Sequence, residues 1–173
     1  MTAAADVRTR VITWEDPAAG YRAAQALSGL EYLQGMVRGE YPFPPMARLL
    51  GIDGMEVEPG RVVMSIEPGE CHYNPMGVAH GGLAATLFDS VMGCAVQTTL
   101  PAGTGYTTLE LKVNFTRAMT NATGRVRCIG TVIHAGSRVA TAEGRLLDEA
   151  GKLYGHATTT CLILPPNGAP PAR

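Results

Sequence analysis

The sequence predicts an α+β protein in which an antiparallel sheet packs around one long helix. The segment from about residue 82 to residue 99 is apolar on nearly every side, which is typical of a buried helix. Segments before and after it alternate apolar with polar side chains, as half-buried strands do. Short turns at residues 134–137 and 149–151 join the later strands. Short turns predict hairpins, so these strands should form an antiparallel meander.

The N-terminal region is expected to form a tail and one helix packed on the main domain. Asp16 is a suitable N-cap, Pro17 suits the first helical position, and apolar residues recur from there to Met36 at roughly helical spacing. Residues 1–50 therefore precede the main domain, with one further helical turn expected before Gly51. The main domain spans residues 51–164, and the Pro-rich ending, residues 165–173, predicts a disordered tail.

The clearest strand patterns lie on either side of the apolar helix. In residues 61–67, Val62, Met64 and Ile66 alternate with less apolar neighbours. In residues 105–117 the alternation assigns two faces to the strand. The face toward the core would carry Leu109, Leu111, Val113 and Phe115, and the polar face Thr108, Glu110, Lys112 and Asn114.

A membrane-spanning interpretation of the apolar segment is disfavoured. Residues 83–100 are barely long enough to span a bilayer, and they contain the carboxylate of Asp89. A buried helix fits better, but one curved sheet can cover only part of it. The rest needs the N-terminal helix or a second copy of the chain, so we expect a homo-oligomer, either a dimer or a dimer of dimers.

Composition excludes several classes of protein. The chain has 173 residues, 46% of them hydrophobic, which is ordinary for one globular domain. A net charge of -1 gives no basic field for nucleic acid or anionic lipid. No apolar run follows the first residues, so we expect no secretory signal and a cytoplasmic location. The four cysteines have no metal-site spacing and should be free thiols in a reducing compartment; they are Cys71, Cys94, Cys128 and Cys161.

Asp89 is the residue that the burial pattern does not explain. A carboxylate in an apolar setting costs several kcal/mol unless it is hydrogen-bonded or paired, and no Lys or Arg lies within two helical turns of it. Either polar groups from another part of the chain satisfy it structurally, or desolvation adjusts it for proton transfer or nucleophilic attack. Both interpretations are open from this residue alone.

Gly81 and Gly82 stand where the predicted helix begins. Glycine at a helix N-terminus lets a ligand approach bare backbone N–H groups at the positive end of the helix dipole, and such a group can hold a developing oxyanion. The equally plausible alternative is a tight turn between strand and helix.

Three further polar residues near these glycines are weaker candidates when each is taken alone. His80 beside the helix start is more typical of a loop anchor than of a catalyst. Asn74 precedes a proline and would commonly open a turn. Thr108 is first interpreted as an ordinary polar position of its strand.

Together these residues resemble a known family. The run NPMGVAHGGLAATLFDSVMG is similar to the motif of hotdog-fold acyl-CoA thioesterases of the phenylacetate-pathway (PaaI-like) group, in the 4-hydroxybenzoyl-CoA thioesterase superfamily. In that group an Asn stands six residues before the His of an HGG motif, and an acidic residue stands nine after it. Asn74, His80 and Asp89 match both spacings. The resemblance covers roughly residues 51–164, and HGG with both spaced residues and a following meander is a fairly specific combination.

The resemblance implies a hotdog fold, in which the sheet wraps the long helix, and dimers with shared active sites. His80 and Gly81 of one chain would face Asp89 of the other. This fits helix geometry, because nine residues rotate by about two and a half turns and place the two ends of the motif on opposite sides. The implied reaction is thioester hydrolysis: the Gly81 N–H polarises the carbonyl, and Asp89 activates water or attacks directly.

The resemblance also implies supporting roles for other residues. Asn74 would position the thioester or the water, and His80 would steady the loop. A Ser or Thr of the strand after the helix would lie near the water, and we choose Thr108 over Thr107 because the alternation puts Thr107 on the core face. No metal or organic cofactor is expected. Basic side chains at the cleft rim would contact CoA phosphates, although each could equally be a solvated surface charge; the candidates are Arg117, Arg138 and Lys152.

Two other functions remain as alternatives on the same scaffold. One is a hotdog enoyl-CoA hydratase, but the Asp/His or His/Glu arrangement of those enzymes is missing from the sequence. The other is a non-catalytic module that binds or senses acyl-CoA, since fold alone does not define function. The acidic residue of the motif favours the enzyme.

Overall fold

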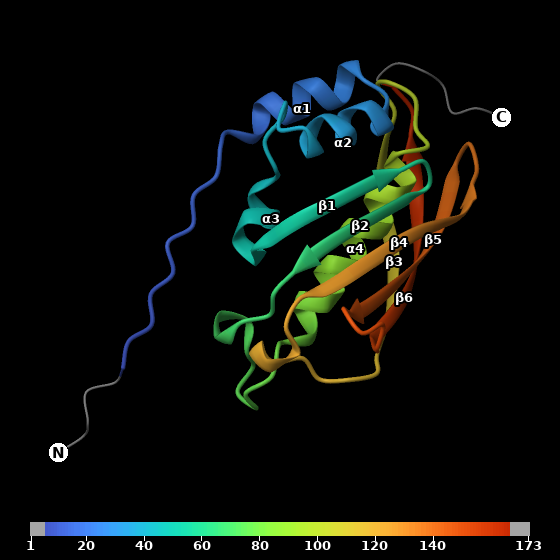
Figure 1. Ribbon diagram of the computed structural model, residues 1–173. Coiled ribbons are helices and arrows are strands. Elements are labelled where there is room, and N and C mark those ends of the chain that lie inside the picture. The colour runs from blue at the N-terminus through green and yellow to red at the C-terminus, as the bar shows by residue number, and fades with distance from the viewer. Residues whose placement is uncertain (1–5, 167–173) are drawn as a thin grey trace.

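The sheet and its central helix have the predicted arrangement. The computed structural model describes residues 6–166, and Figure 1 shows a curved sheet wrapped around one long helix. The strand order is β1-β2-β4-β5-β6-β3, and every neighbouring pair is antiparallel. This confirms the α+β class and the meander. The strands are β1 (Ile52–Glu58), β2 (Arg61–Ile66), β3 (Gly105–Phe115), β4 (Val126–Ala135), β5 (Val139–Asp148) and β6 (Leu153–Leu164).

The helices are α1 (Pro17–Ala26), α2 (Gly29–Val37), α3 (Pro45–Leu50) and the long central helix α4 (Gly81–Gln97), with short 3-10 turns at Glu70–His72 and Asn121–Thr123. Asp16 caps α1 and α3 ends at the left-handed Gly51, as predicted. The predicted C-terminal tail lies outside the described residues except for its first two positions. None of the helices between residues 6 and 166 has the length and apolar character needed to cross a membrane.

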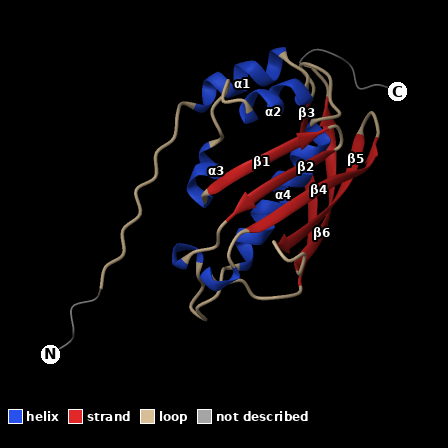
Figure 2. Cartoon of the chain, viewed as in Figure 1, coloured by secondary structure: helices blue, strands red, loops and turns tan. Residues whose placement is uncertain are grey.

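The prediction of a single N-terminal helix was wrong. Leu27 is extended and Ser28 begins a second helix, because its hydroxyl accepts from the Glu31 N–H while the Glu31 carboxylate accepts from the Ser28 N–H. This capping box fixes a new helix start directly after α1 ends. Figure 2 shows α1 and α2 together at the end of the molecule where α4 also ends. There the Gly29 N–H donates to the Leu100 carbonyl at 3.0 Å.

Helix α4 is held close to the sheet by glycines on three neighbouring strands. A Cβ on Gly130 of β4 would lie 2.5 Å from the backbone of Val91, and one on Gly144 of β5 would lie 2.7 Å from the Phe88 ring. Gly155 of β6 faces the same ring. Because these positions carry no side chain, the helix backbone can approach the strands directly.

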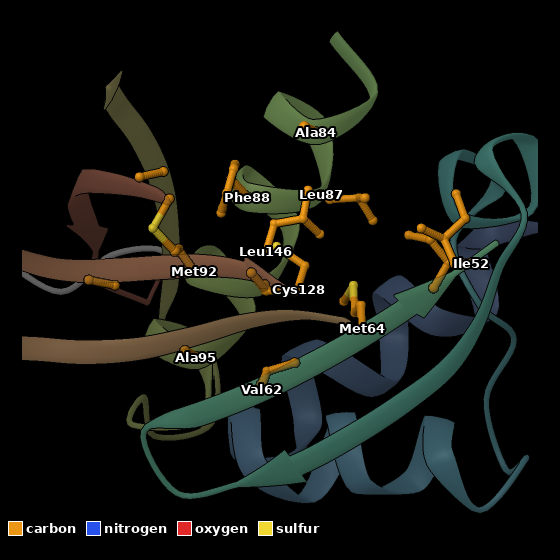
Figure 3. Close-up of a cluster of buried hydrophobic side chains, with 14 of the residues drawn as sticks. Ile52, Val62, Met64, Ala84, Leu87, Phe88, Met92, Ala95, Cys128 and Leu146 are labelled. Carbon is orange, nitrogen blue, oxygen red and sulfur yellow. The ribbon is translucent and has the colours of Figure 1, made fainter. Parts of the chain in front are cut away.

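The side chains around these contacts form one continuous hydrophobic core. Phe88 and Leu87 of α4 are fully buried, and Figure 3 shows them among Leu146, Cys128 and Met64 of the sheet. Interiors of this kind are packed like organic crystals and hold their backbone in place. The core therefore fixes which side chains of α4 remain at its uncovered face, and Asp89 is one of them.

Candidate active site

The loop before α4 is shaped by Asn74. Its side-chain oxygen accepts from the Met76 N–H at 2.9 Å, and its own N–H donates to the Val78 carbonyl at 2.8 Å. Gly77, at φ 74°, completes the turn. The side-chain oxygen of Asn74 is thus used by the loop, while its amide nitrogen has no hydrogen-bond partner among residues 6–166. That N–H₂ group can donate to a bound molecule.

His72 fastens the same loop to the rest of the domain, a role that the sequence analysis missed. Its Nδ1 accepts from the Gly69 N–H at 3.0 Å, and its Nε2 donates to the Leu50 carbonyl at 3.0 Å. Its backbone carbonyl accepts from the His80 N–H at 2.8 Å. Burial lowers the pKa of His72. Only a neutral imidazole can accept at Nδ1, so the loop geometry requires the uncharged form.

His80 caps α4, and the cap leaves one backbone donor free. The Nδ1 atom of His80 accepts from the Gly82 N–H at 2.9 Å. The N–H of Gly81, the first residue of α4, has no partner within the described part of the chain. The Phe115 ring lies over Gly81, and a Cβ there would be 3.1 Å from it. A free N–H at the positive end of a 17-residue helix suits a carbonyl oxygen that gains negative charge.

Asp89 is half-buried and held by a residue of β3. The Thr108 hydroxyl donates to one carboxylate oxygen of Asp89 at 2.8 Å. The residue chosen from the sequence therefore contacts Asp89, but the reasoning from alternation was wrong. A β-bulge at Leu109 shifts the register between β3 and β6, so Leu109 is 59% exposed and Thr108 points toward α4. Thr107 is exposed to solvent.

Buried groups next to Asp89 stay neutral. Burial, and then the negative charge of Asp89, raises the pKa of Cys94 to about 12. Burial also raises the pKa of Tyr106 well above its ordinary value, and the nearby Cys94, Cys161 and Asp89 add to this effect. Cys161, opposite Thr108 on β6, has its pKa raised by burial as well. All four cysteines are free thiols, and those beside Asp89 are unsuited to act as nucleophiles.

A cavity of about 430 Å³ opens beside the helix N-terminus and contains several of the predicted residues. Its wall includes Asn74, Gly81 and Arg117. The Arg117 guanidinium lies over the Tyr154 ring, with its central carbon 5.9 Å from the ring centroid. The remaining lining is largely apolar and includes Met76, Ala84, Phe115 and Met119. This space is therefore suited to a ligand that has both an apolar part and an anionic group.

The other two predicted CoA contacts lie elsewhere in the protomer. Lys152 is in the turn between β5 and β6, where its N–H donates to the Asp148 carboxylate at 2.9 Å. Arg138 is at the opposite end of the sheet from Arg117 and lines a separate cavity together with residues 162–166. One chain therefore does not bring Arg138 and Arg117 together.

The catalytic candidates also form two separate groups within one protomer. Gly81 and Asp89 are eight residues apart on α4, a separation of about 12 Å along the helix axis. A thioester carbonyl hydrogen-bonded to the Gly81 N–H would therefore be out of reach of the Asp89 carboxylate of the same chain. Within one chain the Gly81 N–H and the Asp89 carboxylate are therefore two separate candidate groups, called half-sites below.

Comparison with known proteins agrees with this architecture. Residues 76–154 match the family model of the thioesterase superfamily. A candidate esterase of Saccharolobus solfataricus is 32% identical over 117 residues, which cover 68% of this chain and 81% of that protein.

Two solved structures extend the comparison. A candidate thioesterase of Ralstonia eutropha JMP134, related to phenylacetic acid degradation, is 32% identical with a TM-score of 0.67, over 76% of this chain and 98% of that one. A variant of the phenylacetic acid degradation protein PaaI of Thermus thermophilus is 28% identical with a TM-score of 0.62. The match covers 69% of this chain and 98% of that one.

The long helix enclosed by an antiparallel sheet, with an HGG helix start, defines a hotdog-fold thioester hydrolase. Within that class the chain belongs to the thioesterase superfamily and to its PaaI-like group.

The histidine that fastens the loop should make stability depend on pH. The folded-state pKa of His72 lies below its ordinary value of 6.5, so the unfolded chain binds a proton first as the pH falls. The contribution of His72 is complete above about pH 6.5 and is lost on acidification toward its lowered pKa. Urea unfolding at pH 8 and pH 5.5 measures this loss.

The control is His72→Asn, whose side-chain oxygen can take the place of Nδ1 and does not titrate. We expect the wild type to lose more stability than this variant between the two pH values. Equal losses would show that His72 does not carry the effect.

Proposed function

We propose that the protein hydrolyses acyl-CoA thioesters to the free acid and CoA at sites shared by two protomers. The observation that carries this proposal is the pair of half-sites along α4. One is the free Gly81 N–H at the helix start, and the other is the Asp89 carboxylate held by Thr108. Thioester hydrolysis needs both an oxyanion donor and a base or nucleophile at one carbonyl. Two copies of the chain can supply both.

The exposed strand β3 supports pairing between two copies. It is the last strand of the described sheet, it has 11 residues, and the apolar side chains of Leu109 and Phe115 are 59% and 57% exposed. A long edge strand with unpaired backbone groups and some exposed apolar side chains is a template for pairing. If β3 pairs in an antiparallel way with β3 of a second copy, a two-fold axis relates the two chains. Each chain then uses the same surface for the interface.

This pairing would join the two half-sites. In one protomer β3 runs antiparallel to α4, with Phe115 on Gly81 and Thr108 beside Asp89. Pairing β3 with a two-fold copy about its middle brings the end of one strand beside the start of the other. Asp89 of one protomer then lies toward the Gly81 end of the other. Two such dimers could associate further as a dimer of dimers.

The proposed chemistry follows from these positions. The Gly81 N–H of one protomer donates to the thioester carbonyl oxygen and stabilises the negative charge that forms on it. Asp89 of the other takes a proton from water as the water oxygen bonds to the carbonyl carbon, or it attacks directly to give a mixed anhydride that water then cleaves. In either route the C–S bond breaks, and the CoA sulfur leaves and is protonated. Thr108 keeps one carboxylate oxygen in place and leaves the other for the reaction.

The proposed binding of CoA uses the cavity beside the helix start. The amide nitrogen of Asn74 would donate to the thioester or the water, and Arg117 would contact a phosphate. The backbone carbonyl of Arg138 accepts a hydrogen bond from the Ile163 N–H. Ile163 is paired with Tyr106, near the start of β3. In the antiparallel dimer the Arg138 of one protomer would therefore approach the Arg117 end of the other. Lys152, in the turn between β5 and β6, does not line this cavity and is left out of the proposed contacts.

Replacement of the carboxylate tests the reaction itself. We expect the wild type to release thiol from short, medium, long or aryl acyl-CoAs, and Asp89→Asn to lower kcat by about 10²–10⁴-fold because it removes the base or nucleophile. Circular dichroism should show an unchanged fold. Binding of acyl-CoA by the wild type without any thiol release would favour the non-catalytic alternative.

Two adjacent threonines provide a matched test of how Asp89 is held. Thr108→Val removes a hydrogen bond to a charged group, so kcat/KM should fall by about ten- to a hundred-fold. Thr107→Val changes the neighbouring exposed residue and should leave kcat/KM near the wild-type value. Equal effects of the two substitutions would contradict the proposed contact.

Mixing two inactive variants tests whether the sites are shared. Asp89→Asn and Asn74→Ala would each damage both sites of their own dimers. A mixed dimer has one of its two sites with both residues intact. Random exchange of subunits makes about half of the dimers mixed, so it should restore about a quarter of wild-type activity. If both residues acted within one chain, mixing would restore nothing.

A further inference from the structure

The free edge of β3 presents the backbone groups of alternate residues. Beyond its bulge the strand pairs regularly with β6, and the Thr116 N–H donates to the Tyr154 carbonyl at 3.0 Å. In an antiparallel ladder the backbone groups of successive residues point to opposite sides, so those of Leu111, Val113 and Phe115 point away from β6. A second strand at this edge would therefore bond to the odd-numbered residues.

Glu110 and Lys112 lie on the outer face of this edge, on either side of Leu111, which packs against the core. Both are exposed, and neither forms an ion pair within residues 6–166. On β6 they face the uncharged Thr160 and Thr158, and the Thr160 hydroxyl donates to the Glu110 carboxylate at 3.4 Å. The edge thus carries one charge of each sign that a second strand could meet.

A two-fold axis near the middle of β3 can take only a few positions. For the core faces of the two strands to match, the axis must pass through a residue, which then faces its own copy. An axis through Glu110 sets two carboxylates opposite each other, and one through Lys112 sets two ammonium groups opposite each other. Like charges at facing positions destabilise the pairing. An axis through Leu111 instead sets the Glu110 of each chain opposite the Lys112 of the other.

The half-sites select the same register independently of charge. Phe115 lies on the first residue of α4, and Thr108 donates to Asp89. To join the half-sites, Thr108 of one chain must lie close to Phe115 of the other. With the axis at position 111, Thr108 faces Asn114, directly beside Phe115. An axis at Val113 would carry Thr108 past Phe115 and beyond the end of β3.

We propose that Glu110 and Lys112 fix the register in which two copies of the chain pair, each carboxylate facing the ammonium group of the other chain. The inference rests on the proposed shared site and names the contacts that assemble it. In this register the two residues face each other at a position between hydrogen-bonded pairs, where Cα atoms are about 4.5 Å apart and side chains are closest. Opposite charges there favour pairing, whereas a lysine that only guards a free edge would oppose it.

Charge reversal tests the two ion pairs, with the dissociation constant of the dimer measured by analytical ultracentrifugation. Glu110→Lys and Lys112→Glu each set like charges opposite each other twice, so each should raise the dissociation constant by roughly ten-fold or more. The Glu110→Lys/Lys112→Glu double variant only exchanges the signs and should dimerise like the wild type. An equal mixture of the two single variants should form heterodimers, because opposite charges face each other again.

Glu143→Lys is the matched control, because Glu143 is exposed on the interior strand β5 and lies two residues before Arg145. It makes the same charge change away from the edge and should leave the dissociation constant unchanged. Lys112→Ala separates pairing from guarding: it should weaken the dimer, and a tighter dimer would overturn the inference. Single charge reversals that dimerise like the wild type, or a mixture without preference for heterodimers, would overturn it too.

Cysteine cross-linking tests the register without reference to charge. In a Cys71→Ser background, which removes the exposed thiol, Glu110→Cys and Lys112→Cys chains are mixed and oxidised. With the axis at Leu111 the new thiols face each other only in mixed dimers, so a disulfide-linked dimer should form in the mixture and in neither variant alone. Cross-linking of one variant alone would place the axis at that residue and overturn the inference, as would a mixture that forms no cross-link.

Dimerisation and hydrolysis are measured separately, so the inference and the proposed function can fail separately. If the charge and cysteine variants behave as expected but no acyl-CoA is cleaved, the register stands and the hydrolytic function fails. If acyl-CoA is cleaved but the cross-links report another axis, only the register is wrong. If the chain cleaves acyl-CoA as a monomer, the shared site and the register are both wrong.

Discussion

The close contact between α4 and the sheet is the constraint on which the rest of the structure depends. Glycines on β4, β5 and β6 let the strands meet the helix backbone and the Phe88 ring with no side chain between them. A helix held this closely cannot rotate or slide without overlap of atoms. Its axial position then decides the partners of every residue along β3: Phe115 meets Gly81, Thr108 meets Asp89 and Tyr106 meets Gly93. The chemistry of the site is thus set by packing on the far side of the helix.

Electrostatics divide α4 into two ends with different properties. At its start, a free N–H and the helix dipole favour a partial negative charge, and Arg117 lies at the same cavity. In its middle, Asp89 carries a negative charge among groups whose burial keeps them neutral, Cys94 and Tyr106. The bond from Thr108 is the only side-chain hydrogen bond that Asp89 makes among residues 6–166. One carboxylate oxygen of Asp89 is therefore held by Thr108, and the other has no side-chain donor in the described part of the chain.

Much of the fold could be predicted because the relevant patterns are local. Alternation, turn residues and helix caps act within a few positions, so α4, the meander and the caps at Asp16 and Gly51 follow from the sequence. Errors arose where a local signal competed with another. The capping box of Ser28 and Glu31 was present but was outweighed by the longer helical spacing. The bulge at Leu109 depends on pairing with β6 across the sheet, and a strand pattern alone does not contain that information.

The site shows the same division between local and distant information. Asn74, His80, Gly81 and Asp89 were found because their spacing along one loop and one helix carries the signal. His72 and Phe115 were missed because their roles depend on contacts with the Leu50 carbonyl and with Gly81 that only the folded chain creates. The family match covers residues 76–154, which include the helix start and Asp89 but not α1 and α2. The shared part of the chain therefore carries the elements of thioester chemistry. Helices α1 and α2 lie outside the match and pack at the C-terminal end of α4, where Gly29 contacts Gln97 and Leu100.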